Sequence, residues 1–191
     1  GIDLDKKYKQ AYKDANKYLG LKEQKFLIGD SLKLLFSKKE IKKILGRKKF
    51  HLIAIDPPYS DMLSRKKTGE AVKKNKSVEA TPFTDLKEDL GNMEYEEFLS
   101  SMSQSIIDAA SLLENKGNII VFTKDLQPTT EKPNLLHSDL INKIIEIPNI
   151  EYRGMKIWSD ESINLYPYGY PYAFSMNQLH QYILIFRKVN K

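Results

Sequence analysis

Four consecutive residues, Asp56-Pro57-Pro58-Tyr59, bring together groups that can take part in chemistry. Asp56 supplies a carboxylate, the prolines supply carbonyls without a competing N–H donor, and Tyr59 supplies an aromatic ring. Pro58 restricts Pro57 to an extended conformation, so the backbone that carries these groups is stiff. The segment therefore predicts a rigid site that holds a carboxylate, free carbonyls and a ring.

The residues before this tetrapeptide predict the element that positions it. Residues 51–55 are mostly apolar and include Ile53 and Ile55, a pattern typical of a strand buried on both faces, as in a parallel sheet. The prolines end this strand at Asp56. Because open α/β sheets bind ligands at the carboxyl ends of their strands, the tetrapeptide is expected at a ligand site. The alternative interpretation is a strand followed by an ordinary proline turn.

With this tetrapeptide, the sequence resembles the S-adenosylmethionine-dependent amino-group DNA methyltransferases, the adenine-N6 and cytosine-N4 family, over essentially all 191 residues. The resemblance implies that Asp56, Pro57, Pro58 and Tyr59 are catalytic. The Asp56 carboxylate and the Pro57 carbonyl would accept hydrogen bonds from the exocyclic amine of a base, at a fixed separation. Tyr59 would stack on that base after it is flipped out of the duplex.

Two acidic residues, each at the end of a predicted strand, are the candidates that the resemblance implies for binding the cofactor. Residues 2–5 read as a short strand ending in acid, and in nucleotide-binding α/β folds an acid at the end of the second strand binds ribose hydroxyls. The resemblance assigns Asp3 to the ribose and Leu4 to the adenine of S-adenosyl-L-methionine, and Asp30, with Ser31 beside it, to the adenine amino group. The alternative for both acids is helix capping, and in Asp30 the two roles can coexist.

The expected fold is an α/β, Rossmann-like methyltransferase sheet, mostly parallel, with an antiparallel carboxy-terminal strand pair at residues 151–158 and 181–187. Residues 93–113 and 135–147 have the apolar spacing of amphipathic helices, and residues 118–123 read as a buried strand. The whole of 1–191 is expected to be one catalytic domain. The resemblance implies a first strand and a glycine-rich cofactor loop ahead of residues 2–5. No such loop occurs in these residues, so both are expected to be missing and the domain to be amino-terminally incomplete.

Two segments are candidates for contact with nucleic acid. Residues 60–84 read as a long, flexible basic loop beside the tetrapeptide, in which Lys66 and Lys67 could bind phosphates. Tyr168 and Tyr170 lie in a segment rich in tyrosine and proline and could stack on bases. The alternatives are a solvated loop and a hydrophobic loop that packs on the sheet.

Composition narrows the class of protein. The formal net charge of +6 is compatible with a polyanionic partner, although lysine-rich sequences reach the same balance without one. There is no cysteine, and the three histidines are far apart, so no metal site is expected. No run of eighteen apolar residues and no signal-peptide pattern occurs. The expectation is a cytoplasmic protein without metal or membrane contact.

The predicted activity is transfer of a methyl group from S-adenosyl-L-methionine to DNA, at adenine N6 because family members that begin this motif with Asp are often adenine enzymes. Cytosine N4 stays open, as do the recognition sequence, a homodimer and a restriction partner in a restriction-modification system. One alternative is an RNA base amino-methyltransferase, since those families share the tetrapeptide. Another is a non-catalytic nucleic-acid-binding subunit on a degenerate methyltransferase fold.

Overall fold

The computed structural model describes residues 1–37, 41, 43, 46, 49–64, 77, 79–126, 134–162, 167–168, 175–176 and 178–190. The strands are β1 (Ile2–Asp3), β2 (Leu27–Ile28), β3 (Phe50–Ile55), β4 (Leu113–Thr123), β5 (Ile150–Ser159), β6 (Pro167–Tyr168), β7 (Ser175–Met176) and β8 (His180–Lys188). The helices are α1 (Lys7–Tyr18), α2 (Ser31–Phe36), α5 (Tyr95–Ser111) and α6 (Leu136–Ile145), with the 3-10 helices η1 (Ser60–Leu63) and η2 (Leu90–Asn92).

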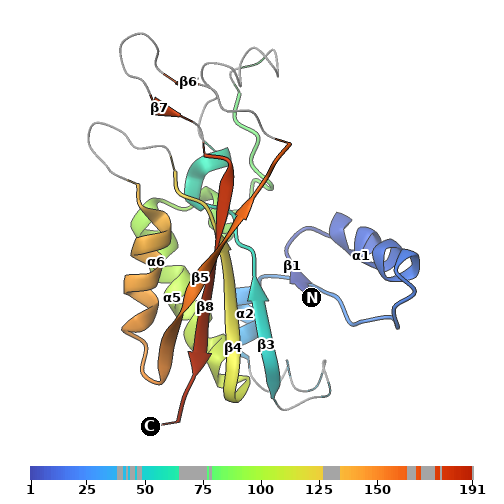
Figure 1. The fold of residues 1–191 in the computed structure, drawn as a ribbon. Helices are drawn as coiled ribbons and strands as arrows, with labels where there is room; N and C mark the ends of the chain where they lie inside the picture. The colour runs from blue at the N-terminus through green and yellow to red at the C-terminus, as the bar shows by residue number, and fades with distance from the viewer. Residues whose placement is uncertain are drawn as a thin grey trace.

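Four strands form the main sheet, in the order β3-β4-β8-β5 (Figure 1). β3 and β4 are parallel, with Ile55 beside Val121, whereas β8 runs antiparallel to both β4 and β5. β1 and β2 form a separate parallel pair. The structure is therefore the predicted Rossmann-like α/β fold, and its carboxy-terminal strands pair antiparallel as the sequence predicts.

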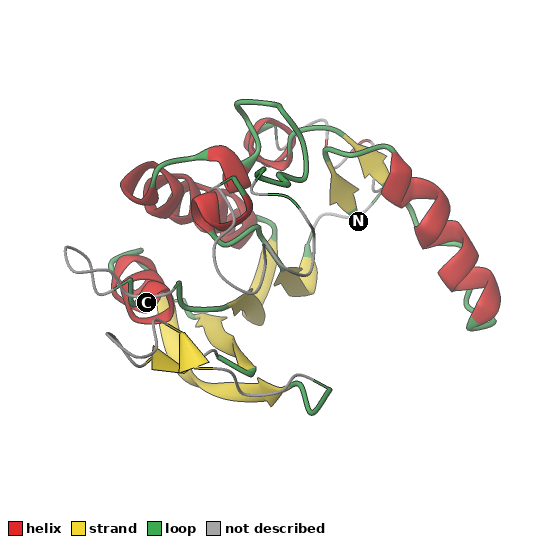
Figure 2. Cartoon of the chain, turned by 90° about the horizontal axis from the view of Figure 1, so that it is seen from above, coloured by secondary structure: helices red, strands yellow, loops and turns green. Residues whose placement is uncertain are grey.

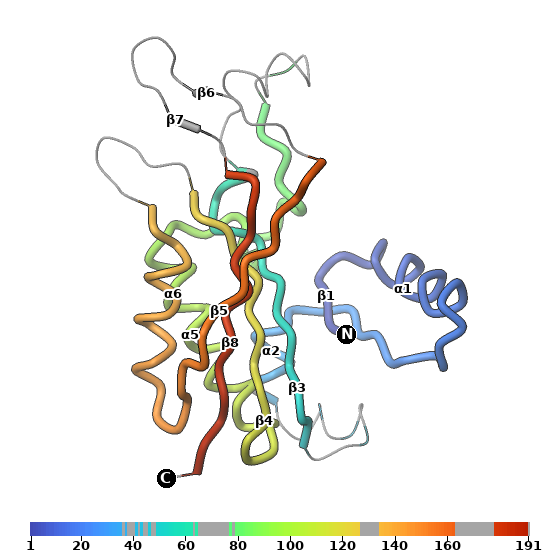
Figure 3. The backbone as a smooth tube through the Cα atoms, in the orientation of Figure 1, coloured from blue at the N-terminus to red at the C-terminus, as the bar shows by residue number. Residues whose placement is uncertain are grey.

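Helices cover one face of this sheet, as Figure 2 shows from above. The buried residues of α5 include Phe98, Met102 and Ile106, which recur at the spacing of one helical face. They pack in a core with Leu140 of α6 and with alternate residues of β4 and β8. The chain path in Figure 3 also shows α1 away from this core, beyond β1.

The burial of β3 differs from the prediction. The sequence predicts a strand buried on both faces, but Leu52 is 52% exposed and Ala54 is exposed as well. Ile53 and Ile55, on the other face, are half-buried and pack against the core. The prediction was wrong because β3 lies at an edge of the sheet and the described helices cover only one of its faces.

Candidate functional site

One cavity of about 770 Å³ runs along β3 and past its carboxyl end, a volume within the range of small-molecule sites. The sequence-predicted residues that line it come from three strand ends: Asp3 and Leu4 at the end of β1, Asp30 and Ser31 after β2, and Asp56, Pro57, Pro58 and Tyr59 after β3. Residues as far apart in the sequence as Asp3 and Tyr59 thus meet at one cavity. Their roles in catalysis and cofactor binding remain predictions.

The chain turns sharply after the tetrapeptide. Ser60 has a φ of 53°, in the left-handed region, and its backbone N–H donates to the Pro58 carbonyl at 3.1 Å. The Ser60 side chain is buried, and its hydroxyl donates to the Met93 carbonyl at 3.2 Å. This bond ties the end of the tetrapeptide to the start of α5, so its position depends on residues more than thirty positions later in the sequence.

η2 packs directly on the second proline. A Cβ placed on Gly91 would lie 2.9 Å from the Cβ of Pro58, closer than two carbon atoms can approach without a shift. Ser64, at the end of η1, donates its hydroxyl to the Gly91 carbonyl at 2.6 Å. Glycine at this position therefore allows the backbone of η2 to support the proline ring.

A second segment, around residues 83–92, forms another part of the cavity wall. Asp89 accepts hydrogen bonds from the Gly91 N–H at 2.9 Å and from the Thr84 hydroxyl at 2.8 Å. The Asn92 amide donates to the carbonyls of Thr84 and Leu86 at 2.8 and 2.9 Å. These bonds fix the backbone next to Phe83, which lines the cavity and is 46% exposed.

Five residues of this wall line the cavity: Phe83, Thr84, Glu88, Asp89 and Leu90. Phe83 and Thr84 belong to the loop predicted at residues 60–84, no prediction was made for the other three, and the contribution of this wall to the cavity was not foreseen. The available signal was the Thr84 and Asp89 pair, because such side chains stabilise turns by accepting backbone N–H donors. That signal predicts a turn, but it does not show which part of the fold the turn contacts.

Desolvation dominates the electrostatics of the tetrapeptide. Asp56 is exposed, but protein atoms around its carboxyl displace water, and this desolvation raises its pKa. Burial, together with the nearby Asp56 carboxylate, raises the pKa of Tyr59 to about 12. Tyr59 therefore keeps its proton at neutral pH and presents an uncharged ring.

The acids on the other side of the cavity already have structural partners. Asp3 accepts the Asp5 N–H at 2.8 Å. Asp30 caps α2 by accepting the Leu32 N–H at 2.9 Å, which makes it the helix cap that the sequence analysis kept as an alternative. Its second oxygen lies 3.5 Å from the Lys33 ammonium, which also contacts Glu88 at 3.1 Å.

These groups fit a ligand with both a planar ring and hydroxyl or amino donors. A carboxylate accepts more than one hydrogen bond, so Asp3 keeps acceptor capacity beyond its one backbone partner. Apolar wall residues include Leu4, Ile53 and Pro57, against which a ring can pack. The arrangement can hold an adenosine-like group at one end and offer a carboxylate and a stiff carbonyl at the other.

The remaining candidates are not brought to this cavity by the described structure. Lys66, Lys67 and Tyr170 lie outside the described residues. Tyr168 lies in β6, which pairs antiparallel with β7, and its side chain is outside the described part. The predicted loop at 60–84 begins with η1, and its residues 65–76 and 78 are not among the residues that the structure describes.

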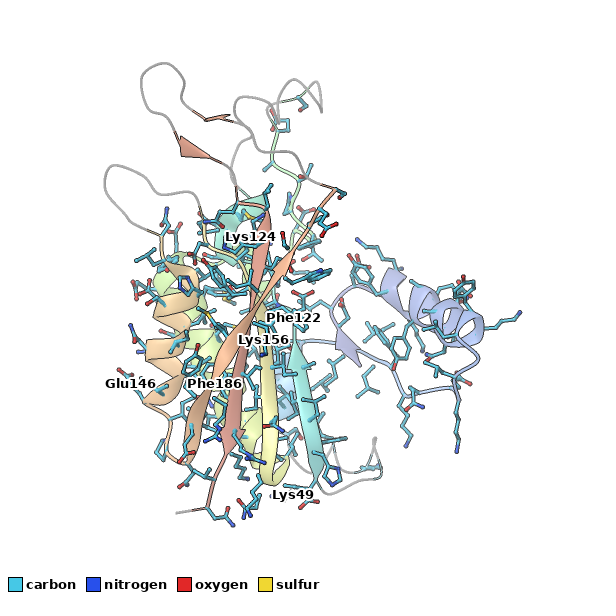
Figure 4. The ribbon with its side chains drawn as sticks, viewed as in Figure 1. Lys49, Phe122, Lys124, Glu146, Lys156 and Phe186 are labelled. Carbon is cyan, nitrogen blue, oxygen red and sulfur yellow. The ribbon has the colours of Figure 1, made fainter. Side chains whose placement is uncertain are left out.

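A polar cluster follows β4, the neighbour of β3. Asp125 is buried, accepts the His137 N–H at 2.9 Å and lies 2.8 Å from its ring Nδ1. The Tyr182 ring stacks on His137 with centroids 4.1 Å apart, and His180 meets Tyr182 edge-on. Lys124, labelled in Figure 4, donates to the Gln178 carbonyl at 2.9 Å, and burial lowers its pKa. This cluster fixes the start of α6 against the sheet.

Among the described residues, no group of three or more His, Asp or Glu side chains is arranged to hold a metal ion. Within that same part of the chain, no helix is both long enough and apolar enough to cross a membrane.

Comparisons with known proteins show the fold. No family model and no curated protein matches the sequence.

Among solved structures, TTHA0409 of Thermus thermophilus, named as a DNA modification methylase, matches with a TM-score of 0.51 and 17% identity over 85% of this chain and 52% of its own. Its complex with S-adenosyl-L-methionine matches with a TM-score of 0.50 and 19% identity over 85% of this chain and 54% of its own. TrmN from Thermus thermophilus matches with a TM-score of 0.52 and 14% identity, over 98% of this chain and 35% of its own. The chain thus has the fold of these proteins and spans about half the length of the first two.

Proposed function

We propose that this chain transfers a methyl group from S-adenosyl-L-methionine to the exocyclic amine of a flipped-out base, with adenine N6 in DNA as the first candidate. One observation carries the proposal. Asp56-Pro57-Pro58-Tyr59 is held by η1 and η2 at the edge of the same cavity that Asp3 and Asp30 line. A fold shared with a DNA modification methylase that binds S-adenosyl-L-methionine supports it.

On this proposal, the cofactor supplies an electrophilic methyl group on a sulfonium. The lone pair of an exocyclic amine is delocalised into the base, so the nitrogen is a weak nucleophile. Asp56 and the Pro57 carbonyl would accept its two N–H hydrogens and favour a lone pair directed at the methyl carbon. The nitrogen would form its bond to the methyl carbon as the sulfur–carbon bond broke, and the nitrogen would then lose a proton to solvent.

Three features of the chain would support this step. The buried Pro57 and its packing through Pro58 on Gly91 keep the acceptor carbonyl in place, which reduces the entropy lost in the transition state. Tyr59 stays uncharged and can stack on the base. Asp3 and Asp30 would bind the ribose hydroxyls and the adenine amine of the cofactor.

The test is transfer of a labelled methyl group from S-adenosyl-L-methionine to DNA and to RNA, with the modified nucleoside identified by mass spectrometry. We expect N6-methyladenine in DNA. Asp56→Ala should abolish transfer but leave cofactor affinity within about twofold, because its carboxylate serves the amine. Asp14→Ala is the control, since Asp14 is exposed on α1.

Each alternative outcome selects another function. Methylcytosine in DNA would keep the mechanism and change the base, and a labelled RNA base would replace DNA as the substrate. If Asp56→Ala and Asp14→Ala reduced methyl transfer equally, the proposed catalytic role of Asp56-Pro57-Pro58-Tyr59 would be wrong. Nucleic-acid binding with neither cofactor binding nor transfer would identify a non-catalytic subunit.

A further inference from the structure

β5 is the outermost strand of the main sheet, on the side away from β3 and its cavity (Figure 1). It pairs with β8 along one edge, and among the described residues no strand lies along its second edge. Backbone N–H and C=O groups along an unpaired edge can form a ladder with another strand. The second edge of β5 is therefore a surface that is separate from the candidate site.

A bulge divides β5 into two halves. Tyr152 is in register with Phe186 and Gly154 is in register with Ile185, which leaves Arg153 as an extra residue. Gly154 has a φ of +110°, which glycine adopts readily. Because the bulge inserts one residue, even positions before it and odd positions after it lie on the same face of the sheet.

Only the first half of β5 is covered on that face. Ile150 is buried, and Tyr152 is half-buried with its ring centroid 5.6 Å from that of Phe186. Met155 and Ile157 follow on the same face, but they are 42% and 62% exposed. The edge of β5 thus presents large apolar side chains that a neighbouring strand would cover.

We propose that two copies of this chain pair through the free edge of β5, antiparallel, about a two-fold axis between Arg153 and Gly154. In this register Ile150 lies opposite the second copy's Ile157, and Tyr152 lies opposite its Met155. The bulge brings both pairs onto one face, so the exposed half of each strand meets the covered half of the other. The two main sheets become one sheet, with four strands from each copy.

The same register pairs opposite charges on the other face. Glu151 lies opposite the second copy's Lys156, and the two-fold axis makes this pair twice. Lys156, labelled in Figure 4, is exposed and has no ion-pair partner among the described residues. The Glu151 carboxylate lies 3.7 Å from the Arg153 guanidinium of its own strand and can accept a second cation. The edge is therefore complementary to itself in charge as well as in apolar contacts.

Neighbouring registers lose this match. A shift of two residues in one direction sets Lys156 opposite the second copy's Arg153, and in the other direction it sets Glu151 opposite Gly154. The first shift places like charges together, and the second removes the ion pair. Charged side chains and bulges normally keep edge strands from pairing. On β5 they permit one partner, a second copy in one register.

This pairing leaves both cavities open. Each cavity lies along β3, at the far side of its own sheet from β5. The two β5 strands run antiparallel, so the two copies of the tetrapeptide lie at opposite edges of the joined sheet. The inference does not rest on methyl transfer, and its test is separate from that of the proposed function.

Sedimentation equilibrium of the 191-residue chain from about 1 to about 200 µM is the first measurement. We expect a monomer–dimer equilibrium with a dissociation constant in the micromolar range, because the paired edges are short. Hydrogen exchange at the two ends of this concentration range should show added protection of β5 amides at the higher concentration, with no change in β3.

Charge reversal tests the register. Lys156→Glu and Glu151→Lys each place like charges at both ion pairs, so each variant alone should associate about tenfold more weakly or less. An equimolar mixture of the two variants should associate again, because every glutamate then meets a lysine of the other variant. Thermal unfolding checks that Glu151→Lys folds, since its new lysine lies beside Arg153 and Arg187.

Ile157→Asp tests the apolar contact without the ion pairs. It should also weaken association about tenfold or more, because a carboxylate replaces an apolar side chain at the interface. Leu52→Asp is the matched control, since Leu52 is 52% exposed on β3, at the other side of the same sheet. We expect Leu52→Asp to associate as the unchanged chain does.

Three results would overturn the inference. One is a monomer over the whole concentration range. Another is a mixture of the two charge variants that associates no more strongly than either variant alone. The third is equal weakening by Leu52→Asp and Ile157→Asp, which would place the contact between copies away from β5.

Discussion

Gly91→Ala is the substitution that most directly tests how the site is held. The new Cβ would lie 2.9 Å from the Cβ of Pro58 and 3.2 Å from Oδ1 of Asp89. Carbon atoms in contact sit at about 3.5–4.0 Å, so Pro58 or η2 must move by roughly 0.6 Å or more. Neither neighbour can rotate away. Pro58 is a ring, and the Asp89 carboxylate is held by hydrogen bonds from the Gly91 N–H and the Thr84 hydroxyl.

Overpacking of this kind costs about 1–3 kcal/mol in the free energy of unfolding. A displacement of Pro58 also moves the Pro57 carbonyl, since the two share a peptide bond. A misplacement of about 1 Å at a reacting centre lowers a rate about a hundredfold, so roughly half that shift should lower it about tenfold. Cofactor affinity should change little, because Asp3 ends β1 and Asp30 caps α2, and neither residue is part of β3 or η2.

Chemical denaturation and single-turnover methyl transfer measure the two effects. Gly20→Ala is the matched control, because Gly20 has a φ of +64° and no atoms within 4 Å of its built Cβ. The strain of a left-handed alanine should cost about 1–2 kcal/mol without touching the cavity. Unchanged stability in Gly91→Ala, or equal loss of transfer in both variants, would refute the packing argument.

Three further predictions follow from single contacts. Asp56→Asn should stabilise the chain at neutral pH: desolvation raises the pKa of Asp56, so its ionised form is the unfavourable one. This gain in stability should disappear as the pH falls below the ordinary pKa of aspartate. Thermal unfolding measured across pH tests it, and a variant less stable than the wild type at pH 7 would contradict the prediction. Tyr95→Phe removes a 2.6 Å hydrogen bond to Asp139 and should cost about 1–3 kcal/mol in urea unfolding, whereas no change would mean that water replaces it. Asp125→Ala removes the acceptor of the His137 N–H and should destabilise α6 by about 1–2 kcal/mol, seen as faster hydrogen exchange in that helix than in α5.

The positions of the candidate site residues at strand ends were predictable from short stretches of sequence. Asp56-Pro57-Pro58-Tyr59 predicts a stiff segment at a strand end, and the structure places it directly after β3. Asp3 and Asp30 were located as acids that follow strands, and they line the same cavity as the tetrapeptide. Such features are local, because proline stiffness and strand or helix periodicity depend on residues a few positions apart.

Contacts between distant segments were not readable. Gly91 supports Pro58 and Ser60 bonds to Met93 across about thirty residues, and no pattern in the sequence pairs these positions. Phe83 looks like part of a polar loop until the fold brings it to the cavity. The exposure of Leu52 was predicted wrongly because an apolar strand has the same sequence pattern whether or not a neighbouring element covers it.

Sequence by itself determined which groups this protein carries and which elements present them. The tertiary structure decided which of those groups meet and which surfaces stay open, because packing joins residues whose separation along the chain leaves no periodic signal.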